Sequence, residues 1–308
     1  MAKPALKTVT RTQGNNRALK AGEVTPAGFD LDFEEIPVLV AGFRRMVRAL
    51  EFDVCEMAIT TYLCAKEHGV AFTALPVFLV RGFHHGAIVT REALSPKDIE
   101  GRRVGVNRGY TVTTGVWARG VLSAEHGVDT DRVTWALSGN EHVAQYRPPA
   151  NVVPADGDLA DLLASRDLAA AIGVADDAAH PLIPDAEEAG YAALRERGHY
   201  PINHLVVVKD EVLDAHPEVA ADVFEAFAES KRRYVEQLRR GAVESPTKVD
   251  RMHQRVMEIT GDDPLPYGIE PNRAVIDELI DHAMAQHILT KRPEVADLFA
   301  DGTRDRLG

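Results

Sequence analysis

Short apolar runs alternate with amphipathic segments along most of this chain, and the alternation limits the folds open to it. Turn residues or helix stops recur about every 15–25 residues. Strands are expected at Leu6–Thr10, Asp53–Met57 and Val104–Val106. Helices are expected at Pro37–Leu50 and Thr60–His68. Strands that alternate with helices of this length form sheets covered by helices, so the sequence predicts an α/β protein.

Two of the apolar runs, 77–89 and 199–208, contain ionisable side chains where a buried strand normally has none. These residues are Arg81, His84, His85, His199 and His204. Burying a polar group without a partner costs roughly 2–7 kcal/mol, so a functional reason is expected. The chain order makes the two runs crossings between two α/β lobes. Because ligand sites favour domain interfaces, we expect the ligand in the cleft between the lobes.

The predicted lobes are discontinuous in sequence. Lobe 1 comprises residues 1–88 together with 203–308, which includes the C-terminal helices, and lobe 2 comprises residues 89–202. The helical C-terminal third could serve as the interface of a homo-oligomer, although no sequence feature fixes the oligomeric state.

Composition and charge exclude several classes of protein. A hydrophobic content of 45% in 308 residues is enough for a sizeable core. The net charge of −12 argues against a nucleic-acid partner, because phosphate binding needs a basic face. No apolar run approaches the roughly 20 residues that span a bilayer, and the first ten residues lack the apolar core of a secretory signal. We expect a cytoplasmic protein that binds no membrane, with Cys55 and Cys64 reduced and buried.

The first interrupted run offers an anion ligand and two candidate proton carriers. The guanidinium of Arg81 has the planar fork that suits a carboxylate, although a salt bridge at the cleft edge is the plainer interpretation. His84 and His85 are adjacent, so on a strand they would point to opposite faces. At most one of them would then meet a ligand directly, unless a bulge at Gly86 turns the chain.

The second run and one earlier carboxylate add further candidates. Asn203 and His204 introduce a Val-rich strand, where capping hydrogen bonds are the alternative explanation. Glu56 is expected at the C-terminal end of a buried strand, the usual functional edge of an α/β sheet. A solvated loop carboxylate is the alternative there.

Residues 109–115 are expected to open a helix and to offer free amides and hydroxyls to an anion, with Tyr110, Thr111 and Thr113 as ligands. Ordinary helix capping would use the same groups. The histidines with Glu56 could also hold a metal, but no spacing typical of a metal site fixes a geometry.

Six sequence blocks resemble those of 4,5-dihydroxyphthalate decarboxylases, and they extend over nearly the whole chain. The blocks are residues 51–57, 80–85, 109–113, 146–152, 200–204 and 263–272. The Pro-Ile-Asn-His and Leu-Pro-Tyr-Gly segments are the more specific ones. The segment Thr12–Arg17 departs from the family pattern; it should face the cleft, which makes Arg17 a candidate substrate ligand and leaves the exact aromatic acid open.

The resemblance implies a two-lobed fold of the type 2 periplasmic-binding-protein kind. It also implies cofactor-free decarboxylation of 4,5-dihydroxyphthalate to protocatechuate and CO2. On this hypothesis Arg81 and the amides of 111–113 bind the two carboxylates of the substrate. His84 or His85 donates a proton to the ring carbon, and His204 with Glu56 acts on the phenolic hydroxyls. The rival functions are a solute-binding protein for a small carboxylate and a metal-dependent aromatic lyase.

Overall fold

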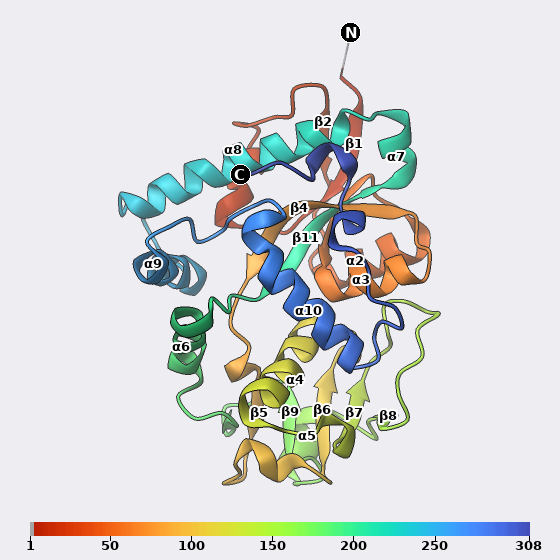
Figure 1. Cartoon of the computed structure of the whole chain (residues 1–308), viewed down its shortest axis with the longest axis vertical. Coiled ribbons are helices and arrows are strands. Elements are labelled where there is room, and N and C mark those ends of the chain that lie inside the picture. The colour runs from red at the N-terminus through yellow and green to blue at the C-terminus, as the bar shows by residue number, and fades with distance from the viewer. Residues whose placement is uncertain (1–2) are drawn as a thin grey trace. The chain divides into compact units, whose positions relative to one another are not determined.

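A computed structural model describes residues 3–308, and the chain divides into two structural units, each with its own sheet (Figure 1). Among the described residues, unit 1 comprises residues 3–81, Ile202–Ile276 and Pro293–Gly308. Unit 2 comprises Gly82–Pro201 and Asp277–Arg292. The predicted lobes differ from these units in residues 82–88, 202 and 277–292. The first of these segments leads into the sheet of unit 2, and the last begins on a helix whose side chains bond to other residues of unit 2.

Unit 1 is built on a sheet in which five strands of the described chain follow the order β2-β1-β3-β11-β4. The strands are β1 (Ala5–Val9), β2 (Asp30–Phe33), β3 (Val54–Ala58), β4 (Phe72–Arg81) and β11 (Ile202–Lys209). Strand β1 runs parallel to β2 and β3, whereas β11 is antiparallel to both of its neighbours. The return strand β11 therefore brings its first residues to the edge at which β3 and β4 end.

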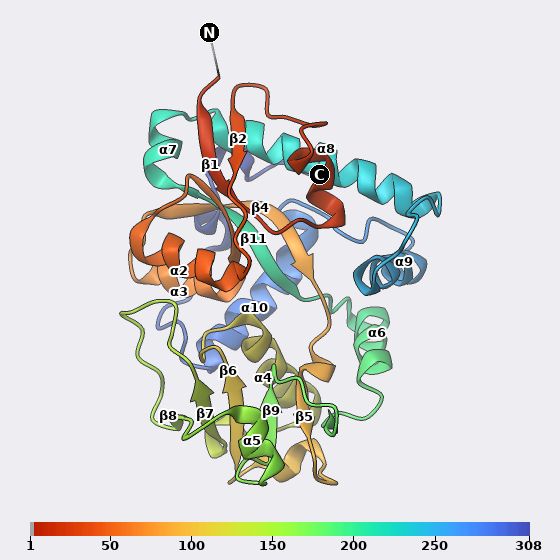
Figure 2. The same cartoon turned by 180° about the vertical axis from the view of Figure 1, so that it is seen from behind.

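Helices cover both faces of this sheet, as the two opposite views show (Figures 1 and 2). One face carries α2 (Leu39–Ala49) and α3 (Ile59–Glu67), and the other carries α8 (Val219–Arg239). The other helical elements of the unit are η1 (Gly14–Asn16), α1 (Arg17–Lys20), α7 (Asp210–Ala215), α9 (Lys248–Thr260), η5 (Glu270–Asn272), η6 (Val295–Leu298) and η7 (Asp301–Thr303). The amphipathic pattern at Pro37–Leu50 and the helix expected at Thr60–His68 thus match α2 and α3 to within two residues at each end, while α7 was not foreseen.

Unit 2 has a second mixed sheet, with the strand order β10-β5-β9-β6-β7-β8. Its strands are β5 (Ile88–Thr90), β6 (Arg103–Asn107), β7 (Thr134–Ser138), β8 (Val152–Pro154), β9 (Ala170–Ile172) and β10 (His180–Pro181). Its helical elements are η2 (His85–Ala87), η3 (Pro96–Ile99), α4 (Thr113–His126), η4 (Thr130–Arg132), α5 (Leu159–Ala164), α6 (Ala186–Arg197) and all but the first turn of α10 (Arg273–Ala285). Two sheets with helices on their faces confirm the α/β prediction.

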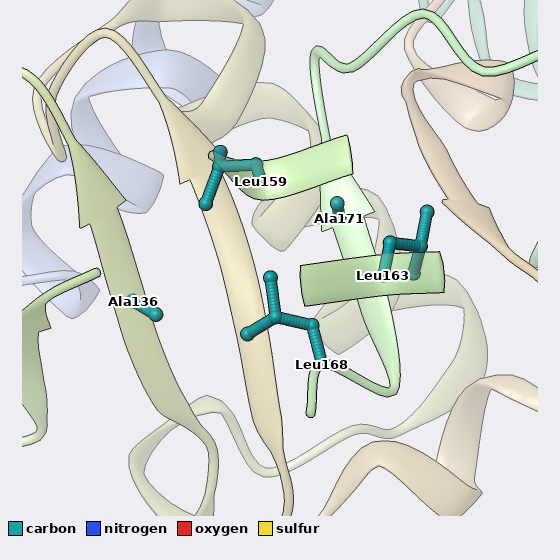
Figure 3. Close-up of a cluster of buried hydrophobic side chains, with 5 residues drawn as sticks. All are labelled: Ala136, Leu159, Leu163, Leu168 and Ala171. Carbon is teal, nitrogen blue, oxygen red and sulfur yellow. The ribbon is translucent and has the colours of Figure 1, made fainter. Parts of the chain in front are cut away.

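The core of unit 2 illustrates how local sequence builds this layer (Figure 3). Asp158 caps α5 by accepting hydrogen bonds from the backbone N–H groups of residues 160 and 161, at 2.8 and 3.3 Å. Leu159 and Leu163 are four residues apart, so they share one face of that short helix. They pack with Leu168 over the small side chains of β7 and β9, where Ala136 and Ala171 leave room for the leucines. The helix is therefore stabilised by its buried face more than by its length.

The apolar run at 77–89 is not the continuous strand that its sequence suggests. Strand β4 ends at Arg81, three residues without regular structure follow, and His85 begins a 3-10 turn. The prediction that His84 and His85 alternate on a strand is therefore wrong. The physical reason is the loss of a partner strand: pairing with β11 ends at Arg81, and the Gly82 N–H makes one further bond, to the Pro201 carbonyl at 3.2 Å.

Within residues 3–308, no helix is both long enough and apolar enough to cross a bilayer.

Candidate functional site

A buried carboxylate and a partly exposed imidazole form a pair on two neighbouring interior strands of the unit 1 sheet. Glu56 is fully buried, and its Oε1 lies 2.6 Å from Nδ1 of His204, whose side chain is 18% exposed. The other carboxylate oxygen, Oε2, accepts the backbone N–H of Arg11 at 2.9 Å. Because a carboxylate only accepts hydrogen bonds, the pair places the donor at Nδ1 of His204, and in a neutral imidazole this leaves the lone pair on Nε2. This arrangement suits proton transfer at Nε2.

Strand register explains why these two residues meet. Val206 of β11 pairs with Glu56, and His204 pairs with Ala58, the last residue of β3. Side chains two residues apart on a strand share a face, so Glu56 and His204 both project toward α2. The ring of Phe43 on that helix meets the His204 ring edge-on, with centroids 5.2 Å apart. Glu56 was expected at the C-terminal end of its strand, but it is the central residue of β3, and the alternative of a solvated loop carboxylate is wrong.

Arg81 ends the neighbouring strand, where it pairs with Ile202. Val80 pairs with His204, and the register of the two strands shifts between these two pairs. Arg81 is 6% exposed, and its guanidinium donates to the side-chain oxygen of Asn272 and lies 5.8 Å from the Phe78 ring centroid. Asn203, between Ile202 and His204, occupies an irregularity in the pairing of β11 with β4 and is half-buried.

Two asparagines fix the loop that follows β1. This loop leads through residues 12–17, where the sequence departs from the family pattern. Asn16 donates to the Arg11 carbonyl at 2.8 Å and accepts the N–H of Gln13 at 2.7 Å. Asn15 donates to the Leu79 carbonyl at 3.0 Å, which ties the loop to β4. The predicted ligand Arg17 follows this loop, is exposed, and lines a cavity of about 510 Å³ on the α8 side of unit 1.

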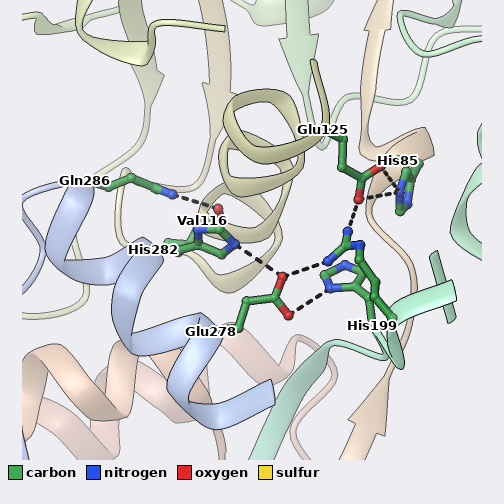
Figure 4. Close-up of polar contacts among 8 residues, drawn as sticks. His85, Val116, Glu125, His199, Glu278, His282 and Gln286 are labelled. Carbon is green, nitrogen blue, oxygen red and sulfur yellow. Dashed lines mark hydrogen bonds and ion pairs between the residues drawn. The ribbon is translucent and has the colours of Figure 1, made fainter. Parts of the chain in front are cut away.

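The histidines of the first run belong to unit 2, where an ion-pair network engages one of them (Figure 4). Nε2 of His85 lies 3.0 and 3.2 Å from the two oxygens of Glu125 on α4, and Arg197 at the end of α6 contacts the same carboxylate. The Arg197 guanidinium also lies 3.1 Å from Glu278 on α10. His85 thus joins η2 to α4 and, through Arg197, to α6.

The second carboxylate of the network anchors α10. Oε2 of Glu278 lies 3.0 Å from Nδ1 of His199, and its Oε1 lies 3.8 Å from Nε2 of His282 (Figure 4). Burial raises the pKa of Glu278, but the hydrogen bonds from both histidines outweigh it and hold the pKa far below its usual range. One helical turn further on, Gln286 donates to the Val116 carbonyl at 2.9 Å. Positions 278, 282 and 286 are four residues apart, so one polar stripe of α10 faces unit 2.

His84 differs from the other histidines of unit 2 because its surroundings disfavour the charged form. The side chain is buried and its ring stacks on Trp117, with centroids 6.3 Å apart. Burial, with smaller contributions from His199 and His85, lowers the pKa of His84 to about 3. The imidazole is therefore neutral at physiological pH, and the imidazolium needed for proton donation is scarce.

The amides predicted to bind an anion hold a carboxylate of the protein itself. Oε1 of Glu141 accepts the Tyr110 N–H at 2.5 Å, and Oε2 accepts the N–H and hydroxyl of Thr111 at 3.2 and 2.7 Å. Gly109, at φ +117°, allows this approach because an added Cβ would lie 3.1 Å from the carboxylate. Thr113 is the first residue of α4 and is buried. The groups expected to bind a ligand anion are therefore held by a carboxylate of the protein itself, that of Glu141.

A buried arginine lies beneath this carboxylate. Arg119 is fully buried, donates to the Tyr110 carbonyl at 2.7 Å and to Gln286 at 2.8 Å, and lies 3.9 Å from the Tyr110 ring centroid. Burial lowers its pKa, and nearby Tyr110, Tyr146 and Glu141 oppose that effect. The positive charge favours an anion at the Tyr110 and Thr111 amides.

Several of these partners were missed by sequence reasoning. They are Glu125, Arg197, Glu278, Glu141, Arg119 and Asn272. The spacing of Glu278, His282 and Gln286 on a predicted helix was a usable signal, because it places three polar groups on one face. Among residues 3–308, no group of three or more His, Cys, Asp or Glu side chains is placed to hold a metal ion.

Comparison with known proteins supplies the relatives of this chain, although no family model matches its sequence. A 4,5-dihydroxyphthalate decarboxylase of Comamonas testosteroni is 28% identical over 97% of this chain and 97% of that protein. A second protein of that name, from Pseudomonas putida, is 34% identical over 51% of this chain and 65% of its own length.

The structural comparison gives the fold. The alkanesulfonate-binding protein SsuA of Xanthomonas axonopodis matches with a TM-score of 0.54 at 14% identity, covering 97% of this chain and 99% of that one. The periplasmic aliphatic sulphonate-binding protein of Escherichia coli gives 0.53 at 10% identity, covering 99% and 100%. The chain is thus a homologue of 4,5-dihydroxyphthalate decarboxylase with the type 2 periplasmic-binding-protein fold.

Proposed function

We propose that this protein is a carboxy-lyase that converts 4,5-dihydroxyphthalate, or a closely related dihydroxylated aromatic dicarboxylate, to protocatechuate and CO2. Homology to a decarboxylase over 97% of the chain supports the reaction class. The single observation that carries the proposal is the Glu56–His204 pair, a buried carboxylate 2.6 Å from a partly exposed imidazole. Such a pair can act as a general base toward a phenolic hydroxyl.

The reaction needs proton transfer at two positions of the ring. Direct loss of CO2 would leave an aryl carbanion, so a proton first adds to the ring carbon that bears the carboxylate. The hydroxyl para to that carbon loses its proton to Nε2 of His204, which pushes electron density into the ring. The bond to the carboxylate then breaks, CO2 leaves, and the electron pair of that bond restores the aromatic ring. Glu56 stabilises the imidazolium that forms on His204.

Other candidate residues receive roles by their chemistry. We assign the proton for the ring carbon to His85 rather than His84, because burial keeps the His84 ring neutral. Arg81 would bind a substrate carboxylate through its guanidinium, with Asn203 and Arg17 as further polar ligands. The amides of Tyr110 and Thr111, next to Thr113, are suited to a carboxylate, and a substrate group there would displace Glu141.

The direct test is turnover by the purified protein. We expect 4,5-dihydroxyphthalate to disappear with formation of equimolar protocatechuate and CO2, and we expect a chelator to leave the rate unchanged. Glu56→Gln and His204→Gln should fold and lose about 10²–10⁴-fold in kcat. Binding of the substrate without turnover would indicate a solute-binding protein instead. Loss of activity with chelator, restored by a divalent cation, would indicate a metal-dependent lyase.

A further inference from the structure

The Leu-Pro-Tyr-Gly-Ile-Glu-Pro-Asn segment, residues 265–272, has no role in the proposed chemistry, yet its backbone is closely fitted to its surroundings. Gly268 is at φ +105°, and an added Cβ would lie 2.5 Å from the Arg306 carbonyl oxygen, so only glycine fits. The Gly268 N–H donates to the Pro76 carbonyl at 2.9 Å, where Pro76 interrupts β4. The segment is therefore fixed against β4, five residues before Arg81.

Asn272 ends this segment with a side chain that has only one available orientation. It is 1% exposed, and its Nδ2 donates to the Pro266 carbonyl at 2.9 Å and to the Gly268 carbonyl at 2.7 Å. Both N–H bonds of the amide are thereby used, and a flipped amide would set its oxygen against two carbonyl oxygens. The side-chain oxygen Oδ1 must consequently face the guanidinium of Arg81, from which it accepts a hydrogen bond.

The partner at position 272 is neutral, and this matters for what Arg81 can do. The Arg91 guanidinium, in contrast, meets both oxygens of Asp176 at 2.7 and 2.8 Å, so its charge is cancelled locally. An amide oxygen fixes the position of a guanidinium without itself carrying a negative charge.

We propose that Asn272 is a positioning residue that orients the Arg81 guanidinium for a substrate carboxylate without placing a negative charge beside it. This inference rests on the proposed function, in which Arg81 binds that carboxylate. Asn272 itself touches no reacting atom. Its effect passes through Arg81, so it should appear in the binding of a carboxylate more than in the chemical step.

The experiment compares Asn272→Ala with Arg81→Gln, the double variant and a matched control in the same segment. The control is Tyr267→Phe, which removes a buried hydroxyl that accepts a 3.4 Å hydrogen bond from Asn15 and leaves Asn272 intact. Phthalate, which lacks the reactive hydroxyls, is the probe, and calorimetry gives its Kd at pH 7. KM and kcat are measured with 4,5-dihydroxyphthalate, and urea unfolding reports stability.

Asn272→Ala should weaken phthalate binding and raise KM by about tenfold, with kcat changed less than about threefold. The double variant should bind no more weakly than Arg81→Gln alone, because both changes act on one interaction. Tyr267→Phe should keep the wild-type Kd and KM even if it is less stable.

Three results would overturn the positioning role, and each is distinct from failure of the decarboxylase activity. If Asn272→Ala lowers stability but leaves Kd and KM unchanged while Arg81→Gln weakens binding, Asn272 is only structural. The same conclusion follows if Tyr267→Phe raises KM as much as Asn272→Ala. If Arg81→Gln leaves phthalate binding unchanged, the carboxylate role of Arg81 fails, and the positioning role fails with it. Absence of turnover with intact, Arg81-dependent phthalate binding refutes only the decarboxylase activity.

Discussion

Removing the His84 imidazole should change how the stability of unit 2 depends on pH. The unfolded ring has a pKa near 6.5, whereas burial lowers the pKa of the folded ring to about 3. Between these values the unfolded chain binds a proton that the folded chain does not. Above pH 6.5 the ring is neutral in both states, so it does not make the free energy of unfolding depend on pH. Below pH 6.5 the free energy of unfolding decreases as the unfolded ring is protonated.

The size of the effect follows from the two pKa values. From pH 7 to pH 5, protonation of the unfolded His84 ring lowers the free energy of unfolding by about 2 kcal/mol. Glu125 and Glu278 also have lowered pKa values in the folded state, so their contribution is lost only as the pH falls below about 4.5. Measurements at pH 5 and above therefore separate the histidine from these carboxylates.

The assay is urea unfolding followed by tryptophan fluorescence. Both tryptophans of the chain, Trp117 and Trp135, are buried in unit 2. His84→Gln removes the titrating group, so its loss of stability between pH 7 and pH 5 should be about 2 kcal/mol smaller than that of the wild type. His68→Gln, at an exposed position, should keep the wild-type pH dependence. An unchanged loss in His84→Gln would refute the neutral, buried state of the ring.

Three further predictions address the two carboxylate sites and the core. Glu56→Gln should lower kcat about 100-fold or more while KM changes little, because the uncharged amide no longer stabilises the imidazolium. Steady-state kinetics at pH 7 measure both constants, and a kcat within about threefold of the wild type would contradict the prediction. Glu141→Ala should tighten phthalate binding several-fold in calorimetry, because it removes the carboxylate that accepts the N–H groups of Tyr110 and Thr111. Weaker binding would show that Glu141 only supports its loop. Leu163→Ala should cost about 2–5 kcal/mol in urea unfolding, and a cost below about 1 kcal/mol would contradict its place in the core.

Periodicity in the sequence was sufficient for the elements that bury a continuous apolar face. The helix expected at Pro37–Leu50 is α2, and the buried run at Asp53–Met57 is β3, shifted by one residue. These elements are determined by neighbours within a few positions of the chain. The same local information failed at 77–89, where the loss of a partner strand, rather than hydrophobicity, ends β4 at Arg81.

Candidate residues were easier to find than their partners. Glu56 and His204 were both named from sequence, and the structure brings them together through the register of β3 and β11. His85 was named as well, but its contact with Glu125 joins positions 40 residues apart, and no local pattern identifies that carboxylate. The Glu141 contact with Tyr110 depends on a loop 31 residues downstream. Long-range polar pairing of this kind is set by tertiary packing, which a single sequence does not encode in its periodicity.

The division of α10 between the two units limits how the protein can be dissected. Residues 273–276 belong to unit 1 and residues 277–292 to unit 2, so a gene fragment encoding 82–201 omits part of the second unit. Such a fragment would lack Glu278 and Gln286, which bond to His199 and Arg119. Two buried donors would then be left without partners, at roughly 1–3 kcal/mol each. A stable isolated unit 2 therefore requires the segment 277–292 to be rejoined to the fragment by a linker or supplied as a separate peptide.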